Sequence, residues 1–203
     1  MPTFRCALLV LAIFAPQDPP KLDLLKLLEP AKDAVEGVWL RDKDALRSPA
    51  MPFARIEVPY EPPDEYDLLL TVERSGSNSF NLGLAHGDVQ FIVVFEGAAQ
   101  GGPKSGLDLI EGQPFYANET STTERCFTDG KPARVLCSVR NAQVKVTVDG
   151  KTLIDWKADY ERLTLYPDWR VRRKRTLFLG SWAPVRILGA ELTEISGAGK
   201  KLR

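Results

Sequence analysis

Hydrophobic and polar residues alternate along most of this chain in short runs separated by turn-forming residues. The clearest runs are 66–73, 135–140 and 143–148, where every second residue is apolar. This period of two is typical of a β-strand with one buried face. Asp149-Gly150 then gives the strongest hairpin signal in the chain. Further strands are expected at 54–58, 80–84, 89–95, 107–109, 125–127, 151–156, 177–179 and 185–195, the last with a bulge at Gly189.

About ten to twelve short strands at this spacing predict an all-β protein, a two-sheet antiparallel jelly-roll sandwich. At 203 residues the chain is long enough for one buried core, and two domains would be crowded. Strands and helices do not alternate, so Rossmann, TIM-barrel and P-loop folds are disfavoured. The glycine-rich stretch 97–106 matches no phosphate-binding spacing either.

The segment before the strands has a different period. Leu22, Leu25, Leu28 and Ala31 follow a spacing near 3.6, which predicts one short helix interrupted near Pro30. We expect this helix to pack on the main body, with a docking helix as the alternative. The expected divisions are a signal peptide, a linker with the helix, the sandwich and a tail, at 1–15, 16–36, 37–198 and 199–203.

The extreme N-terminus has the pattern of a short secretory signal peptide. Arg5 precedes an uncharged apolar run from Cys6 to Ala15, and a proline-rich stretch follows. A run of this length cannot span a bilayer, which needs about 20 apolar residues, so no transmembrane anchor is expected. We expect export to the periplasm or the cell exterior, with cleavage at Ala15 or Ala12. A buried N-terminal strand is the alternative.

Composition and charge narrow the function classes. The chain carries 27 Lys and Arg, 27 Asp and Glu, and a single histidine, His86. A balanced charge gives no general attraction to nucleic acid or to an anionic membrane. One histidine excludes a three-histidine zinc site, and a Ser-His-Asp triad would have to use His86, which the pattern places in a turn. No dense Asp/Asn run indicates calcium, so no cofactor is expected, although a calcium site built from separated loops would leave no such signal.

Signal cleavage would remove Cys6 and leave Cys126 and Cys137, an even pair in an oxidising compartment. A hairpin centred near Lys131 and Pro132 would place these two cysteines opposite each other. They are therefore a candidate disulfide, and the alternative is two small apolar residues in a core.

Several motifs, taken in order, resemble a known family. They are DLLKLLEPAKDAVEGVW, YEPPDEYDLLLTVER, SGLDLIEG, NET, FTDGKPARVLCSVR, VKVTVDGKTLIDW, LFLGSW and LTEISG. From about residue 22 to 198 this order resembles exported proteins of planctomycete-type bacteria in the concanavalin A-like lectin/glucanase superfamily. It is also distantly similar to laminin-G-like jelly rolls and to the three-keto-disaccharide hydrolase domain. The resemblance implies the fold more strongly than any chemistry, because one fold hosts many functions.

One departure from this superfamily bears on catalysis. A laminarinase-type glucanase carries Glu-x-Asp-x-Glu on one strand, which places acid and nucleophile on the same face, and no such string occurs here. If the protein is an enzyme, Asp108, Glu111 and Glu119 are the candidate acid and base groups, and two of them would have to converge in one pocket. A solvated strand rim is the commoner role for such residues.

Aromatic residues supply the candidate carbohydrate site. Tryptophan rings can pack against sugar rings, although most tryptophans of a sandwich belong to its core. Trp182 follows a turn and is the best placed, and Trp156 is also a candidate. Asn118 and Glu119 lie in a polar loop where an amide and a carboxylate can bind hydroxyl groups. Trp39 and Trp169 complete the four tryptophans of the chain.

One marked charge cluster lies near the end of the chain. Its five cations exceed what a sheet can bury, so an exposed loop or edge is expected. The cluster is a candidate surface for an acidic polysaccharide or a phosphate-bearing partner. Nucleic acid is not expected, because no aromatic residues interleave the cations. The residues are Arg170, Arg172, Arg173, Lys174 and Arg175.

Three functions stay open on the sequence. The first is an exported, non-catalytic module that binds carbohydrate or another cell-envelope component through a concave sheet and its rim loops. The second is a glycoside-acting hydrolase of the three-keto-disaccharide hydrolase type. The third is a protein-interaction module without a small ligand. The sequence does not give the ligand or the oligomeric state.

Overall fold

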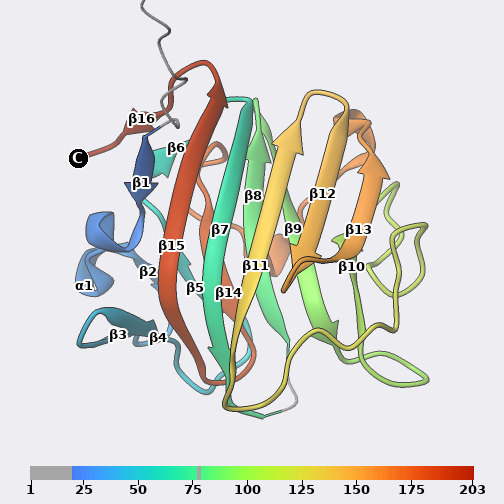
Figure 1. Ribbon diagram of the computed structural model, residues 1–203, viewed down its shortest axis with the longest axis horizontal. Coiled ribbons are helices and arrows are strands. Elements are labelled where there is room, and N and C mark those ends of the chain that lie inside the picture. Colours follow the sequence, from blue (N-terminus) through green and yellow to red (C-terminus); the bar gives the residue numbers. More distant parts are fainter. Residues whose placement is uncertain (1–19, 77–78) are drawn as a thin grey trace, which may run out of the picture.

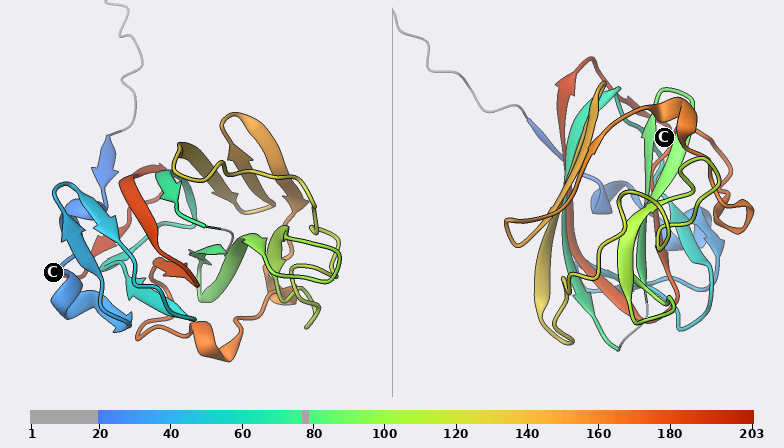
Figure 2. Two further views of the ribbon diagram at one scale, coloured as in Figure 1. Left: turned by 90° about the horizontal axis from the view of Figure 1, so that it is seen from below. Right: turned by 90° about the vertical axis from the view of Figure 1, so that its right-hand side faces the viewer.

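The computed structural model describes residues 20–76 and 79–203, so the expected signal peptide at 1–15 lies outside the described residues. Two antiparallel sheets, which we name sheet A and sheet B, lie face to face (Figure 1). Figure 2 shows the two layers edge on. The expected all-β sandwich of jelly-roll type is confirmed.

Sheet A is the larger layer, with eight strands among the described residues. Across it the order is β13 (Lys151–Lys157), β12 (Gln143–Val148), β11 (Pro132–Arg140), β7 (Glu65–Arg74), β15 (Val185–Ser196), β4 (Ala45–Arg47) and β3 (Leu40–Asp42), and β1 (Lys21–Asp23) also pairs with β15.

Sheet B has six strands in the described part of the chain. Their order is β10 (Lys104–Asp108), β9 (Val89–Gly97), β8 (Phe80–His86), β14 (Phe178–Ser181), β5 (Ala54–Glu57) and β2 (Ala34–Glu36), and a separate ribbon joins β6 (Tyr60–Glu61) to β16 (Lys200–Lys201). The helical turns are η1 (Leu25–Leu27), α1 (Pro30–Asp33), η2 (Tyr160–Arg162) and η3 (Pro167–Trp169). None of the helices within 20–76 and 79–203 is long and apolar enough to cross a membrane.

The core lies between the sheets and is supplied by the alternating runs. On β7 every second side chain is buried and its neighbours are half-buried. On β11 and β12 the inward residues are valines and Cys137, all of them buried. The period of two therefore identifies the inner face of sheet A, as a strand with one buried face requires.

The turn and bulge signals are also confirmed. Asp149 and Gly150 both have positive φ, 48° and 81°, as the central residues of a type I′ hairpin do. The pairing of β15 with β7 shifts register between Ile187 and Gly189. A glycine tolerates such an irregular strand position because it has no side chain to pack.

The N-terminal segment differs from the expectation. Leu25 and Leu28 are buried as a helix face would bury them, but a 3₁₀ turn and extended backbone place them there. Only the single turn α1 is helical, because Pro30 starts it and disfavours helix in the residue before it. The segment expected to be a linker contributes β1 to sheet A and β2 to sheet B. The expected tail contributes β16.

The candidate disulfide is absent, because Cys126 and Cys137 are both free thiols. Cys137 points into the core from β11, which pairs with β7 and β12. No strand forms around Cys126, and its backbone N–H donates to the Glu96 carboxylate at 2.8 Å. The hairpin that would have opposed the two cysteines therefore does not exist. Burial raises the pKa of the Cys126 thiol to about 12, so it is not a reactive thiolate at neutral pH.

A buried ion pair joins the two sheets at one end. Arg74 ends β7 in sheet A, Glu96 lies near the end of β9 in sheet B, and Nη1 and Oε2 are 2.8 Å apart. Burial alone would raise the pKa of Glu96, but the N–H groups of Phe127 and Cys126 and the charge of Arg74 outweigh it and lower that pKa. The ion pair holds the end of β9 in place, where the chain leaves the strand through Gly97.

Candidate functional site

The outer face of sheet B is apolar and covered. Ile92 on β9 and Phe178 on β14 point away from the core, yet both are buried together with Trp169. The segment 160–176, which we call the covering segment, crosses this face. Its helical turn η3 lies on the side of sheet B that faces away from sheet A, as the left view of Figure 2 shows. The Trp169 ring lies close to Gly180, where a Cβ atom would be 2.5 Å from the indole. Glycine therefore allows the ring to approach the strand.

Beside Trp169 the same face opens into a cavity of about 480 Å³, which we call the aromatic cavity. Its volume is in the range that small-molecule sites occupy. It is lined by strands of sheet B and by the loops next to them, at Phe53, Ser79, Asn81, Val94, Gly97, Ala98, Asp108, Leu109, Gly112, Pro114, Phe115, Tyr116, Tyr166, Trp169 and Trp182.

Three aromatic rings form one wall of the aromatic cavity. Phe53 lies between Trp182 and Tyr166, with ring centroids 4.6 Å and 6.4 Å away. The rings of Phe53 and Tyr166 are nearly parallel, at 5°. Trp182 is 41% exposed and Tyr166 is 42% exposed, so a ligand can reach both. The Phe53 and Trp182 rings are tilted by 57°, so the wall is an angled apolar surface with polar tips, which suits a partly wet interface.

Polar side chains of sheet B supply the floor of the aromatic cavity. Asn81 lies on the outer face of β8, and its Nδ2 donates to Ser79 Oγ at 3.2 Å. Asp108 ends β10, and its Oδ1 accepts from the Phe115 N–H at 3.2 Å. An amide, a hydroxyl and a carboxyl group thus meet an apolar wall, which is the composition of a specific small-molecule site.

The carboxyl group of Asp108 has an altered proton affinity. Burial raises its pKa above the ordinary value, although the N–H groups of Phe115 and Leu109 act in the opposite direction. Of the described residues that line the aromatic cavity, Asp108 is the one carboxylic acid. The second carboxylate that a glycosidase of the usual kind needs is not provided by Glu111 or Glu119 at this site.

Glu111 and Glu119 are held elsewhere, by Arg162. The guanidinium donates to Glu111 Oε1 and to Glu119 Oε1, each at 3.0 Å. Trp156 is buried, and its indole N–H donates to the same Glu119 oxygen at 2.5 Å. Hydrogen bonds from Arg162 and Trp156 lower the pKa of Glu119. The structure thus places Glu119 in an exposed ion-pair cluster outside the aromatic cavity, with the buried Trp156 as a hydrogen-bond donor to it.

Asn118, the other expected sugar ligand, holds its own loop together. Its Nδ2 donates to the Leu107 carbonyl at 2.7 Å and to the Gln113 carbonyl at 3.1 Å. Its Oδ1 accepts from the N–H and the hydroxyl of Thr120. With both ends of the amide used inside the protein, Asn118 positions the loop that carries the cavity residues Pro114 to Tyr116.

His86 is the last residue of β8, directly before the turn at Gly87 and Asp88, and does not lie in the turn as expected. Its ring stacks on Tyr160 at 3.8 Å, and its Nε2 is 3.1 Å from Asn141 Oδ1. It does not line the aromatic cavity. The histidine therefore shares no site with Asp108, and the carboxylate–histidine pair that a hydrolase could use is not assembled there.

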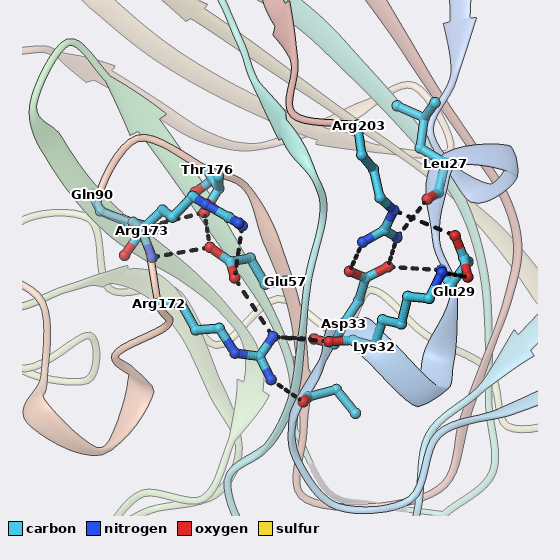
Figure 3. A network of polar contacts seen from close by, with 11 residues as sticks. Leu27, Glu29, Lys32, Asp33, Glu57, Gln90, Arg172, Arg173, Thr176 and Arg203 are labelled. Atoms are coloured by element: carbon cyan, nitrogen blue, oxygen red, sulfur yellow. Dashed lines mark hydrogen bonds and ion pairs between the residues drawn. The ribbon is translucent and has the colours of Figure 1, made fainter.

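The basic cluster is partly used for internal contacts, which Figure 3 shows. Buried Glu57 on β5 accepts from the Arg173 N–H at 3.0 Å and from the Thr176 hydroxyl at 2.9 Å. Arg172 donates to the carbonyl groups of 32–34, with Ala34 at 2.7 Å, and also lies near Glu57. These contacts fasten the covering segment to sheet B. Arg172 and Arg173, two of the five cations in the expected exposed loop, therefore have structural roles.

No metal site emerges among the residues that the structure describes, where no three His, Cys, Asp or Glu side chains gather. Calcium favours several converging oxygen ligands, carboxylates above all. The described residues do not fit that requirement, and we assign no role to a metal.

Sequence reasoning identified Trp182 and Asp108 but missed most of the cavity. Phe53 and Tyr166 lie in loops without periodicity, and long-range contacts bring them together. Asn81 had a usable signal, because it is a polar residue between Phe80 and Leu82 in an otherwise apolar strand. A lone amide at an outward strand position, next to small residues, indicates a strand face that something else approaches.

Comparison with known proteins bears on the fold. Neither the models of protein families nor the curated protein sequences give a match. Solved structures do: the exoplasmic/lumenal domain of VIP36, bound to Ca²⁺ and Man3GlcNAc, is 9% identical, with a TM-score of 0.56 over 85% of this chain and 89% of that chain. The apo Crh5 transglycosylase is 11% identical, with a TM-score of 0.57 over 90% and 86%.

A putative glycosyl hydrolase from Parabacteroides distasonis is also similar, at 11% identity and a TM-score of 0.51, over 80% of this chain and 85% of that chain. At such low identity these similarities show the fold alone. The chain has an antiparallel β-sandwich fold similar to that of these three structures.

Proposed function

We propose that this protein is an exported, non-catalytic module that binds carbohydrate in the aromatic cavity. The observation that carries the proposal is the exposed wall of Phe53, Tyr166 and Trp182 beside a floor with Asn81 and Asp108. The export belongs to the proposal and rests on the apolar run near the N-terminus.

The chemistry of the aromatic cavity suits a sugar ring. A pyranose has an apolar face of C–H groups and an equatorial belt of hydroxyls. The face can pack on Trp182 and Tyr166, since flat rings bury large area without losing many rotamers. The hydroxyls can bind the Asn81 amide and the Asp108 carboxyl, which satisfies polar groups that the ligand would otherwise leave buried without partners.

The neighbours in fold support the proposal by analogy only. VIP36 was solved with a mannose-containing glycan, and Crh5 is described as a transglycosylase. A fold of this kind hosts both binding and catalysis, so the choice between them depends on the site. The aromatic cavity offers one carboxyl group among its described residues, which favours binding over a hydrolase of the three-keto-disaccharide type.

The test compares W182A with I195A in affinity electrophoresis through gels that contain neutral or acidic polysaccharides, with and without calcium. Ile195 is 45% exposed on β15 and therefore controls for the loss of an exposed apolar side chain. We expect W182A to weaken binding by about tenfold, since a packed aromatic ring contributes about 1.4 kcal/mol or more, and I195A to retain it. Equal retardation of both variants and the parent protein, or no retardation on any polysaccharide, would contradict the proposal.

A further inference from the structure

The outer face of sheet B holds a second cavity, of about 420 Å³, which we call the basic cavity. It lies over the start of β9, under the segment that also borders the aromatic cavity. Its lining contains three cations and one carboxylate among the residues Asp88, Val89, Gln90, Leu163, Thr164, Leu165, Arg170, Val171, Arg172 and Lys174. The excess of positive charge is local, because the whole chain is balanced.

Two of these cations are available to a ligand. Among the described residues, the side chains of Arg170 and Lys174 enter neither the hydrogen bonds nor the ion pairs, and both are exposed. Arg172 is committed to the carbonyl groups around Asp33. The cavity's carboxylate, Asp88, is paired with Arg175 at 3.6 Å, so it does not neutralise the two available cations directly.

The backbone that carries Arg170 and Lys174 is fixed. Gln90 on β9 is buried, and its Nε2 donates to the Thr176 carbonyl at 2.6 Å. Glu57 accepts from the N–H of Arg173, the residue next to Lys174 (Figure 3). A backbone held in place lowers the entropy that a charged loop would lose on binding, which is the advantage of a preorganised site.

The basic and aromatic cavities lie along one strand. Gln90 lines the first and Val94 the second, and both belong to β9. Four residues of extended strand span about 13 Å. Tyr166 and Arg170 come from the same short segment, one at each cavity. A chain-like ligand that crosses the segment 160–176 parallel to β9 therefore meets an aromatic wall and then a pair of cations.

We infer that the carbohydrate bound by this protein is an acidic polysaccharide, whose carboxylate or sulfate groups contact Arg170 and Lys174 while a neighbouring sugar ring packs on Trp182. The inference rests on the proposed function, because it assigns a ligand class to the site that includes the aromatic cavity. Guanidinium and ammonium groups are the natural donors to such anions, Arg as a planar fork and Lys as a point charge.

The test uses one polymer in two forms: polygalacturonate, and the same polymer after its carboxylates are reduced to alcohols. The double variant R170Q/K174Q removes the two available cations. Its matched control, R134Q/K157Q, removes the same charge from sheet A, where both residues are exposed. Affinity for each polymer is measured by retardation at 50 mM and 300 mM NaCl, beside W182A.

We expect R170Q/K174Q to weaken binding of polygalacturonate about tenfold at 50 mM NaCl and to leave the reduced polymer unaffected. The difference should shrink at 300 mM NaCl, where screening is stronger. Equal losses in R170Q/K174Q and R134Q/K157Q would overturn the inference, because they would indicate general charge attraction. So would equal binding of both polymers by the parent protein and R170Q/K174Q, an outcome that leaves the proposed function intact when W182A still loses binding.

Discussion

The outer faces of the two sheets differ in how they meet their surroundings. On β7 of sheet A the outward residues Asp67, Thr71 and Glu73 are half-buried polar groups, as on any solvated sheet face. On β9 of sheet B the outward residues Gln90 and Ile92 are buried under the segment 160–176. The outer face of β7 is thus solvated, whereas that of β9 is covered, and the aromatic and basic cavities lie at the borders of the covering segment.

This difference shows where a sandwich can build a site. On a strand whose alternate side chains enter the core, the outer face presents only isolated side chains to a ligand. Where a loop crosses the outer face, the loop residues form the walls of a cavity and the strand residues beneath form its floor. Sheet B can accept such a loop because its outward positions include glycine, alanine and apolar residues, on which rings can pack.

The largest expected effect comes from a variant that weakens the attachment of the covering segment 160–176 to sheet B. In E57A, the N–H of Arg173 loses its acceptor, and the Thr176 hydroxyl keeps only its second acceptor, the Arg173 carbonyl. We expect the free energy of unfolding in urea to fall by about 3 kcal/mol. The control is E191A, which breaks the exposed ion pair with Lys21 and should cost less than about 1 kcal/mol. Similar losses of unfolding free energy in the two variants would show that Glu57 does not attach the covering segment to sheet B.

A second experiment compares the two faces directly. Ile92 is 1% exposed on the outer face of sheet B, whereas Leu69 is half-buried on that of sheet A. We expect I92A to lower the free energy of unfolding by about 2.5 kcal/mol, because it leaves a cavity beneath Trp169. L69A should cost about 1 kcal/mol, since water can fill the space that it leaves. If L69A proved as destabilising as I92A, the two faces would not differ in packing.

The smallest effect is expected at Glu119. Its carboxylate is engaged by Arg162 and Trp156, outside the aromatic cavity. E119Q keeps an oxygen acceptor for Trp156, so retardation on polysaccharide gels should equal that of the parent protein. A loss comparable to that of W182A would move the binding site from the outer face of sheet B to the loop around Glu119.

The sequence predicted the central strands β7, β11 and β12 of sheet A most directly, whereas β1, β3 and β4 of the same sheet were not expected. The alternation over 66–73 and the Asp149-Gly150 turn are local signals, and local signals survive in the fold because the strand period and the turn geometry are properties of the backbone. The leucines before Pro30 were correctly expected to be buried, but a 3₁₀ turn and extended backbone carry them in place of a continuous α-helix. Burial there follows from apolarity, while the backbone follows from the pairing of β1 with β15.

The candidate site was predictable only in part, because long-range contacts with the covering segment bring its residues together. Trp182 was identified from its turn and its size. Phe53 reaches it through the placement of β5, where Arg55 Nε donates to the Arg170 carbonyl at 2.8 Å. That contact joins residues 115 positions apart, and no window of sequence contains it. Asn118 was expected to bind sugar, but its amide is spent on the loop backbone.

Gly180 and Gly83 give the aromatic cavity a constraint of an unusual kind. A Cβ atom at Gly180 would be 2.5 Å from the Trp169 ring, and one at Gly83 would be 2.0 Å from the Phe178 ring. The rings can therefore settle only on strands that lack side chains at these two places. In an evolutionary comparison, the marks of this packing would be two positions without a side chain: Trp182 can be exchanged for another flat ring, whereas an alanine at 180 would displace Trp169, which lines the cavity beside the wall.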